Sequence, residues 1–141
     1  MSGQSSTDVS TSRCENRTCD DLLVVTVHWA QVGSPESYAL SVLREEAPEI
    51  PQRLLERRTW QQLMLPLTAL FVDESMVADH ETEAVHRIRR DRFRQAIHDG
   101  AELPPLIAIK SNRHLVDGYA RLRALRSLAI EDASVVCQVI P

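Results

Sequence analysis

The residue run 117–121 combines side-chain and backbone features that suit the binding of an anion. It consists of Asp117, Gly118, Tyr119, Ala120 and Arg121. The residues before it favour a strand and those after it favour a helix, so the glycine stands where the helix begins. Free N–H groups and the helix dipole attract negative charge there, and glycine lets a ligand come close. The pattern predicts a phosphate site, although a strand–Asp-Gly–helix junction also occurs as plain structure.

Two carboxylates near this turn are candidates for catalysis. Glu81 could act as a general base on a substrate hydroxyl, and Asp117 could orient that hydroxyl or hold Mg²⁺. Phosphoryl transfer needs mainly positioning, a metal ion and neutralisation of charge, so this set would suffice. The alternative for Glu81 is structural, because acidic residues that precede a helix interact favourably with its dipole.

Two arginines in the arginine-rich helix extend this candidate site. At about 100° per residue, Arg92 and Arg89 fall on the side of the helix that carries Val85 and Ile88. An arginine among apolar residues must reach water, pair with a carboxylate or face a polar pocket. We therefore expect Arg92, and with it Arg89, to point toward the anion. The alternative is an ion pair with an aspartate such as Asp117.

Hydrophobic patterning outlines the elements that must position these residues. Apolar and β-branched runs predict strands over residues 22–29, 65–72, 106–110, 113–116 and 134–140. Helical periodicity, bounded by proline and glycine, predicts helices over residues 36–46, 51–63, 83–98 and 119–128. Residues 73–83 are expected to form an acidic loop. Alternating strands and helices indicate an α/β fold with a compact mixed sheet.

The chain has 141 residues, enough for one domain of ordinary size. Residues 1–20 are polar and predict a disordered tail. Residues 21–63 predict a small strand-plus-helices extension, which could pack on the main domain or bind a protein partner. Residues 64–141 predict the main domain.

Three cysteines, Cys14, Cys19 and Cys137, together with the lack of a signal peptide, predict a reducing cytoplasmic location. They lack the spacing of zinc ligands, so we expect no metal site built by the protein. No apolar run approaches the length of a membrane span.

Charge is distributed unevenly along the chain. The net charge is −4, which argues against a general polyanion binder, but residues 86–126 alone carry ten Lys and Arg against four Asp and Glu. A positive block in an acidic protein suits a local anion better than a long duplex.

Residues 64–141 resemble the ParB N-terminal domain and sulfiredoxin superfamily. Gly118, Arg121, Arg123 and Ala124 stand where the family has its Gly-x-x-Arg-x-Arg-Ala motif, which follows a Pro-led strand and a hairpin. The resemblance implies a compact ParB/sulfiredoxin-like α/β fold that binds nucleotide phosphates at this turn. It also implies ATP, ADP or CTP, with Mg²⁺, as the cofactor.

Tyr119 and Ala120 separate this sequence from two branches of the family. Sulfiredoxins carry a catalytic cysteine at this place in the motif, so the difference argues against their reaction. Chromosome-partitioning ParB proteins bind CTP through Gly-Glu-Arg-Arg, and here Tyr119 and Ala120 replace the glutamate and the first arginine. Those proteins also use a helix-turn-helix domain, which would have to come from another chain if this protein were DNA-associated in the same way.

A third branch, the free-serine kinases, uses Asp-Gly-His-x-Arg and a glutamate in an earlier loop. Asp117, Gly118 and Arg121 match this motif, and His80-Glu81 resembles the loop, but the motif histidine is missing. The sequence therefore predicts a nucleotide-binding protein, with phosphoryl transfer to a small hydroxyl compound as its candidate activity. A non-catalytic regulatory module and a DNA-associated, CTP-binding protein are the alternatives. The net acidity disfavours direct contact with DNA.

Overall fold

The structure, a computed structural model, describes residues 25–56 and 58–139. The predicted tail over residues 1–20, with Cys14 and Cys19, lies outside the described residues. Cys137 is free and buried. None of the helices in the described part is long and apolar enough to span a bilayer.

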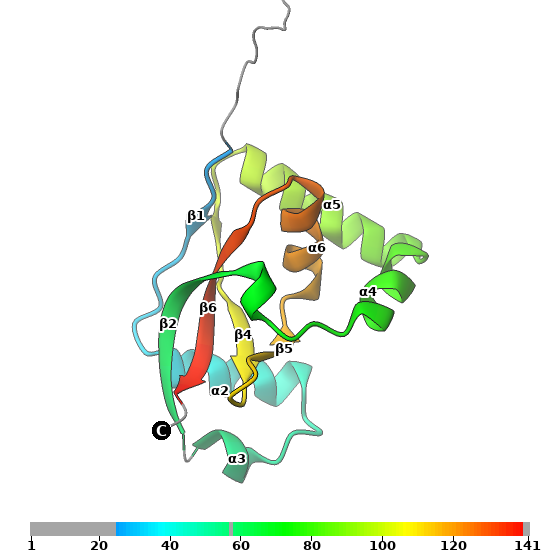
Figure 1. The fold of residues 1–141 in the computed structure, drawn as a ribbon. Helices are drawn as coiled ribbons and strands as arrows, with labels where there is room; N and C mark the ends of the chain where they lie inside the picture. Colours follow the sequence, from blue (N-terminus) through cyan, green and yellow to red (C-terminus); the bar gives the residue numbers. More distant parts are fainter. Residues whose placement is uncertain (1–24, 57, 140–141) are drawn as a thin grey trace, which may run out of the picture.

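A mixed sheet of four strands forms the centre of the fold (Figure 1). β6 (Asp132–Val139) pairs antiparallel with the edge strand β2 (Thr59–Pro66) and parallel with β4 (Leu106–Ile109). β4 also pairs antiparallel with β5 (His114–Asp117), as the predicted hairpin requires. Two further short strands, β1 (His28–Trp29) and β3 (Glu102–Leu103), pair parallel with each other. The predicted α/β class is confirmed.

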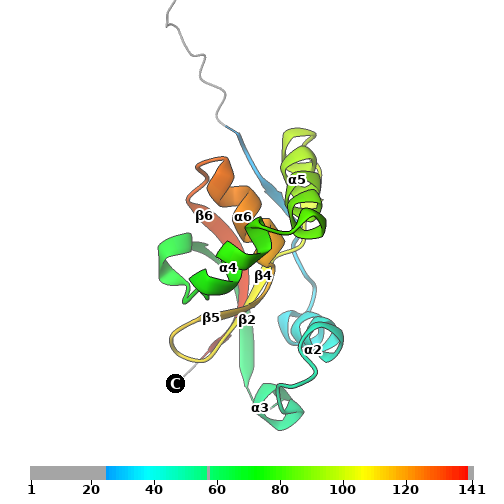
Figure 2. The same cartoon turned by 90° about the vertical axis from the view of Figure 1, so that its right-hand side faces the viewer.

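Helices cover both faces of this sheet (Figure 2). Leu106 and Ala108 of β4 join a hydrophobic cluster with Leu122, whereas Ile107 joins a second cluster with Leu43. The first cluster lies under α6 (Tyr119–Ser127) and α5 (Ala84–His98), and the second under α2 (Pro35–Glu46) and α3 (Gln52–Glu56). Because β4 is buried on both faces, its apolar residues are continuous rather than alternating.

Local signals mark the ends of two helices, and Gly100 after α5 does so as the sequence predicts. α2 begins after Ser34, whose hydroxyl accepts a hydrogen bond from the backbone N–H of Ser37 at 3.2 Å. Pro35 occupies the first turn, where its missing N–H costs nothing. α5 is followed by Gly100 with a φ of +76°, a conformation that glycine adopts readily.

The observed extent of β2 differs from two predicted elements. The helix expected over residues 51–63 ends at Glu56, and the strand expected over residues 65–72 begins earlier, at Thr59. β2 therefore runs across the boundary between the predicted extension (residues 21–63) and the predicted main domain (residues 64–141). A 3-10 helix, η1 (Leu67–Ala69), follows it. Pairing with the whole length of β6 explains the difference, because long-range strand pairing overrides local helical propensity.

Two other predicted elements also differ. Of the strand expected over residues 22–29, the described part contains only β1, because its partner β3 offers just two residues for pairing. The acidic loop expected over residues 73–83 contains a helix, α4 (Glu74–Glu81). Asp73 starts this helix by accepting a hydrogen bond from the N–H of Met76 at 3.1 Å.

The hydroxyl of Tyr38 connects α2 to the residue that precedes β4. It donates a hydrogen bond of 2.9 Å to the carbonyl of Pro105 in a half-buried position. We expect Tyr38→Phe to lower the free energy of unfolding by about 1 kcal/mol, because the carbonyl loses its donor and the ring is kept. Denaturant unfolding of the two proteins would measure this; equal midpoints and slopes would contradict it.

Candidate functional site

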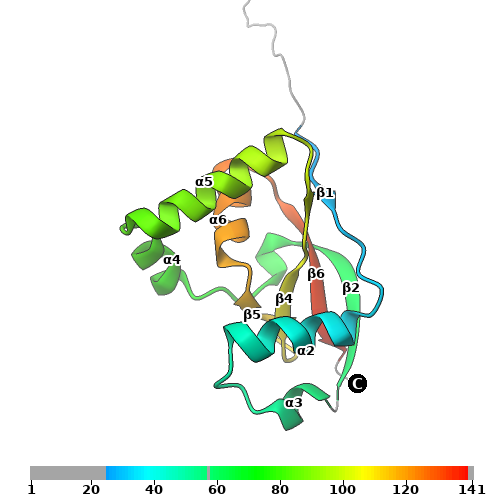
Figure 3. The same cartoon turned by 180° about the vertical axis from the view of Figure 1, so that it is seen from behind.

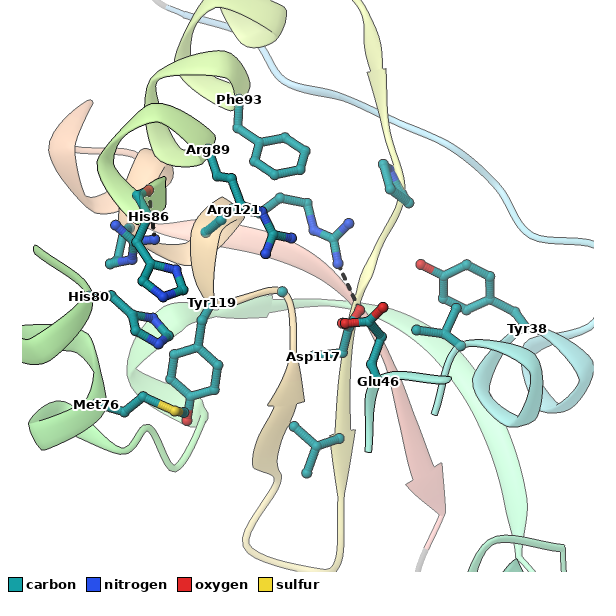
Figure 4. Close-up of a pocket in the computed structure, with 16 residues that line it drawn as sticks. Tyr38, Glu46, Met76, His80, His86, Arg89, Phe93, Asp117, Tyr119 and Arg121 are labelled. Carbon is teal, nitrogen blue, oxygen red and sulfur yellow. Dashed lines mark hydrogen bonds and ion pairs between the residues drawn. The ribbon is translucent and has the colours of Figure 1, made fainter. Parts of the chain in front are cut away.

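A cavity of about 470 Å³ opens where β5 ends and α6 begins. Helix α2 lies on one side of this junction and α4 and α5 lie on the other (Figure 3). Residues from all three helices line the cavity (Figure 4). We call it the α6 cavity. Its lining residues are Tyr38, Val42, Glu46, Met76, His80, His86, Arg89, Phe93, Pro104, Val116, Asp117, Gly118, Tyr119, Ala120, Arg121 and Arg123.

The N-terminus of α6 reaches this cavity without a capping side chain. Gly118 occupies the cap position, and its carbonyl accepts the N–H of Leu122 at 2.8 Å. The earlier N–H groups of a helix have no acceptor within it, and among the described residues the cap residue Gly118 has no side chain to provide one. The positive end of the α6 dipole is therefore open to a ligand.

The backbone at position 118 strongly favours glycine. Its φ is +106°, which L side chains rarely adopt, and a Cβ atom there would lie 2.4 Å from Cδ2 of Leu106. The same Cβ would lie 3.0 Å from Nη2 of Arg121. The close approach of backbone to side chains explains the glycine in physical terms.

Arg121 is held in place beside the cavity. Its Nη2 donates to Oδ2 of Asp117 at 2.9 Å, and the two side chains are 9% and 18% exposed. Its guanidinium carbon lies 5.6 Å from the centre of the Phe93 ring, close enough for a cation–π contact. The Nε of Arg121 is buried and has no hydrogen-bond partner among the described residues. Asp117 is thus engaged with Arg121, which stands next to the helix N-terminus.

Glu81 has a structural environment. Its carboxylate accepts hydrogen bonds from Arg90 and from Nη1 of Arg123, the latter at 2.6 Å. The hydrogen bond from Arg123 lowers the pKa of Glu81, and the charge of Arg90 acts in the same direction, whereas desolvation opposes them. Arg123 also donates to the carbonyl of His86 at 3.1 Å. Glu81 does not line the α6 cavity; it joins α4 and α5 to α6.

The inward face of α5 differs from the prediction. Val85 and Ile88 are 61% and 51% exposed, and Arg92 is exposed and does not line the cavity. Arg89 is also exposed but does line it. The surface that α5 packs against is not apolar throughout, because Arg90, on the inner side of the helix, meets the carboxylate of Glu81.

Tyr119 and Ala120 contribute to the cavity in different ways. Both are nearly buried and line it. The hydroxyl of Tyr119 accepts the N–H of Asp73 at 3.0 Å and donates to the carbonyl of Leu115 at 3.3 Å. Burial raises the pKa of Tyr119. The tyrosine therefore connects the start of α6 to the start of α4.

Several lining residues were not expected from the sequence. They are His80 and His86 from α4 and α5, and Tyr38 and Glu46 from α2. No local motif joins them, because they come from three helices. The described residues contain no group of three or more His, Cys, Asp and Glu that could hold a metal ion.

Comparison with known proteins gives a limited result. No family model matches the chain, and no curated protein matches it. Among solved structures, a Pnob8-like ParB-N domain matches with 18% sequence identity and a TM-score of 0.42. The match covers 59% of this chain and 31% of that one, so it spans less than a third of the matched protein. This comparison assigns no role to any residue of the chain.

Proposed function

We propose that the α6 cavity binds the phosphate groups of a nucleotide. The observation that carries this proposal is the uncapped N-terminus of α6, which opens into a cavity that Arg89, Arg121 and Arg123 also line. A helix N-terminus flanked by guanidinium groups is a favourable place for a phosphate, because dipole, N–H donors and charge act together. A cavity of about 470 Å³ suits a ligand of nucleotide size.

The three arginines differ in how far their charge is already compensated. Asp117 pairs with Arg121, and Glu81 pairs with Arg123. No carboxylate among the described residues lies within ion-pair distance of Arg89. We therefore expect Arg89 to contribute more to the binding free energy of a phosphate than either of the other two arginines. Figure 4 shows Arg89 and Arg121 in the centre of the cavity, between the two histidines and Tyr38.

The geometry supports binding better than catalysis. A general base needs a carboxylate that can reach a substrate hydroxyl, but Glu81 is engaged by two arginines outside the cavity. Asp117 is engaged by Arg121. The described residues contain no group of three or more His, Cys, Asp and Glu that could hold Mg²⁺ without a bound nucleotide. The ion pairs of Glu81 therefore favour a second candidate function, that of a regulatory module that binds a nucleotide without catalysing a reaction.

Calorimetric titration with ATP, ADP and CTP, each with Mg²⁺, tests the proposal, with detection of any product in the same samples. We expect at least one nucleotide to bind. Inorganic tripolyphosphate serves as a control, because it should compete for the same site if phosphate groups supply the binding energy. Binding without turnover would favour the regulatory function, and the absence of binding to any nucleotide would refute the proposal.

Two arginines on α5 provide a matched pair of variants. We expect Arg89→Ala to weaken nucleotide binding by about tenfold or more, the range that follows from losing one charged hydrogen bond. Arg92→Ala removes the same charge from the same helix outside the cavity, so it should change the affinity by less than about twofold at moderate salt. Equal losses in both variants would show that only the general charge of α5 matters.

A further inference from the structure

Two histidines face each other across the wall of the α6 cavity. His80 lies near the end of α4 and His86 in the first turns of α5, and their rings stack with centroids 3.9 Å apart and planes 19° apart. Tyr119 stands edge-on to His80, at 6.3 Å and 87°. Both histidines line the cavity, next to the start of α6 (Figure 4). The stacked pair is therefore placed beside the proposed phosphate site.

Charged and titratable groups from every neighbouring element surround this pair. Nε2 of His86 lies 3.4 Å from Oε1 of Glu83, which is itself 60% exposed. Asp79 and Glu83 favour the charged form of His80, whereas Arg123 and His86 oppose it. The groups that face the pair are Asp79, Glu81 and Glu83 around the α4–α5 junction, Arg89 and Arg90 on α5, and Tyr119 and Arg123 on α6.

This environment favours a neutral His80. Its Nδ1 is buried and has no hydrogen-bond partner among the described residues. A protonated imidazole carries an N–H on both nitrogens, so protonation would leave a buried donor without an acceptor. Desolvation, followed by the charges of His86 and Arg123, lowers the pKa of His80 from its ordinary value of 6.5.

We propose that His80 and His86 form part of the phosphate site and that a doubly charged anion binds there together with a proton taken up by the imidazole pair. This inference rests on the proposed function, since it assigns further ligand residues to the same cavity. An anion adds negative charge beside the two rings and Arg123, and so it offsets the repulsion that opposes the charged form of His80.

The direction of the pH effect follows from linkage. At a pH well above the range in which an imidazole takes up a proton, the affinity does not depend on proton uptake at this site. As the pH falls, the anion-bound form takes up a proton before the free form does, and affinity rises. Uptake of one full proton corresponds to a gain of about tenfold in affinity for each pH unit.

Sulfate is a suitable probe, because it keeps its double negative charge throughout the histidine range. We expect its affinity to rise as the pH falls from about 7.5 to about 5.5, the interval in which histidine titrates. Calorimetry in two buffers of different ionisation enthalpy should show a corresponding uptake of protons. His80→Gln and His86→Gln should each reduce this uptake, whereas His98→Gln, at an exposed position outside the cavity, should not.

The outcomes separate this inference from the proposed function. Sulfate and nucleotide binding without proton uptake would overturn the inference and leave nucleotide binding standing. Failure of sulfate and every nucleotide to bind at any pH in this range would overturn both. If His80→Gln does not fold, the proton uptake on sulfate binding can still be measured in His86→Gln and in the unmodified protein, and it tests the inference. Unchanged proton uptake in a folded His86→Gln protein would also contradict the inference.

Discussion

Replacing Gly118 by alanine is expected to lower the free energy of unfolding by about 2–4 kcal/mol and to abolish binding of nucleotide and sulfate. Backbone strain at φ +106° contributes about 1–2 kcal/mol. The contact of 2.4 Å between the new Cβ and Leu106 contributes about 1–3 kcal/mol as overpacking. Binding is lost because the new Cβ also crowds Nη2 of Arg121, at 3.0 Å, and both Arg121 and the start of α6 line the cavity.

Gly33→Ala is the matched control for this variant. Nothing lies within 4 Å of a Cβ added at Gly33, which is exposed. We expect it to unfold at the same denaturant concentration as the unmodified protein, or slightly above, and to bind sulfate equally well. Binding is compared at a temperature where circular dichroism shows that both variants are folded. Full affinity in a folded Gly118→Ala protein would place the anion elsewhere.

Glu81→Gln is expected to lower the free energy of unfolding by about 3 kcal/mol. The change leaves the guanidinium of Arg123, which is only 3% exposed, without its carboxylate partner. Breaking a buried ion pair from one side costs about 3–5 kcal/mol. We expect the lower end of this range, because the side chain of Glu81 is 36% exposed and water can enter. Denaturant unfolding at neutral pH measures the difference.

Glu74→Gln makes the same chemical change in a solvent-exposed ion pair with Arg126. Its effect should stay below about 1 kcal/mol, the range of surface pairs. Equal effects in the two variants would show that Glu81 has no special structural role. Sulfate affinity should survive in Glu81→Gln, since Glu81 does not line the cavity. A nucleotide-dependent turnover that this variant abolished without loss of affinity would instead support a catalytic Glu81.

The pH dependence of Glu81→Gln has a definite sign. The hydrogen bond from Arg123 lowers the pKa of Glu81 below its ordinary value of 4.5 in the folded protein. Its ion pairs therefore stabilise the protein above about pH 4.5, and this contribution is lost as the pH falls through the lowered pKa. The difference in stability between the unmodified protein and Glu81→Gln should thus shrink in acid. A difference that stays constant to about pH 3 would contradict this assignment.

The turn at residues 117–121 could be predicted because its signals are local. Strand, glycine and helix follow one another along the chain, and α6 begins at Tyr119, where the helix was expected. Gly100 after α5 and the hairpin of β4 and β5 were predictable for the same reason. In each case the residues that determine the backbone path lie within a few positions of it.

Tertiary structure alone decided which residues gather around this turn. Residues 59–63 follow β6 rather than their helical pattern, because strand pairing supplies hydrogen bonds that neighbours in sequence cannot. Arg89 rather than Arg92 lines the cavity, because the inner face of α5 meets a carboxylate as well as apolar residues. Periodicity detects an apolar partner surface but not a charged one. The sequence thus predicted where the helix N-terminus lies, and the packing of α2, α4 and α5 determined which side chains surround it.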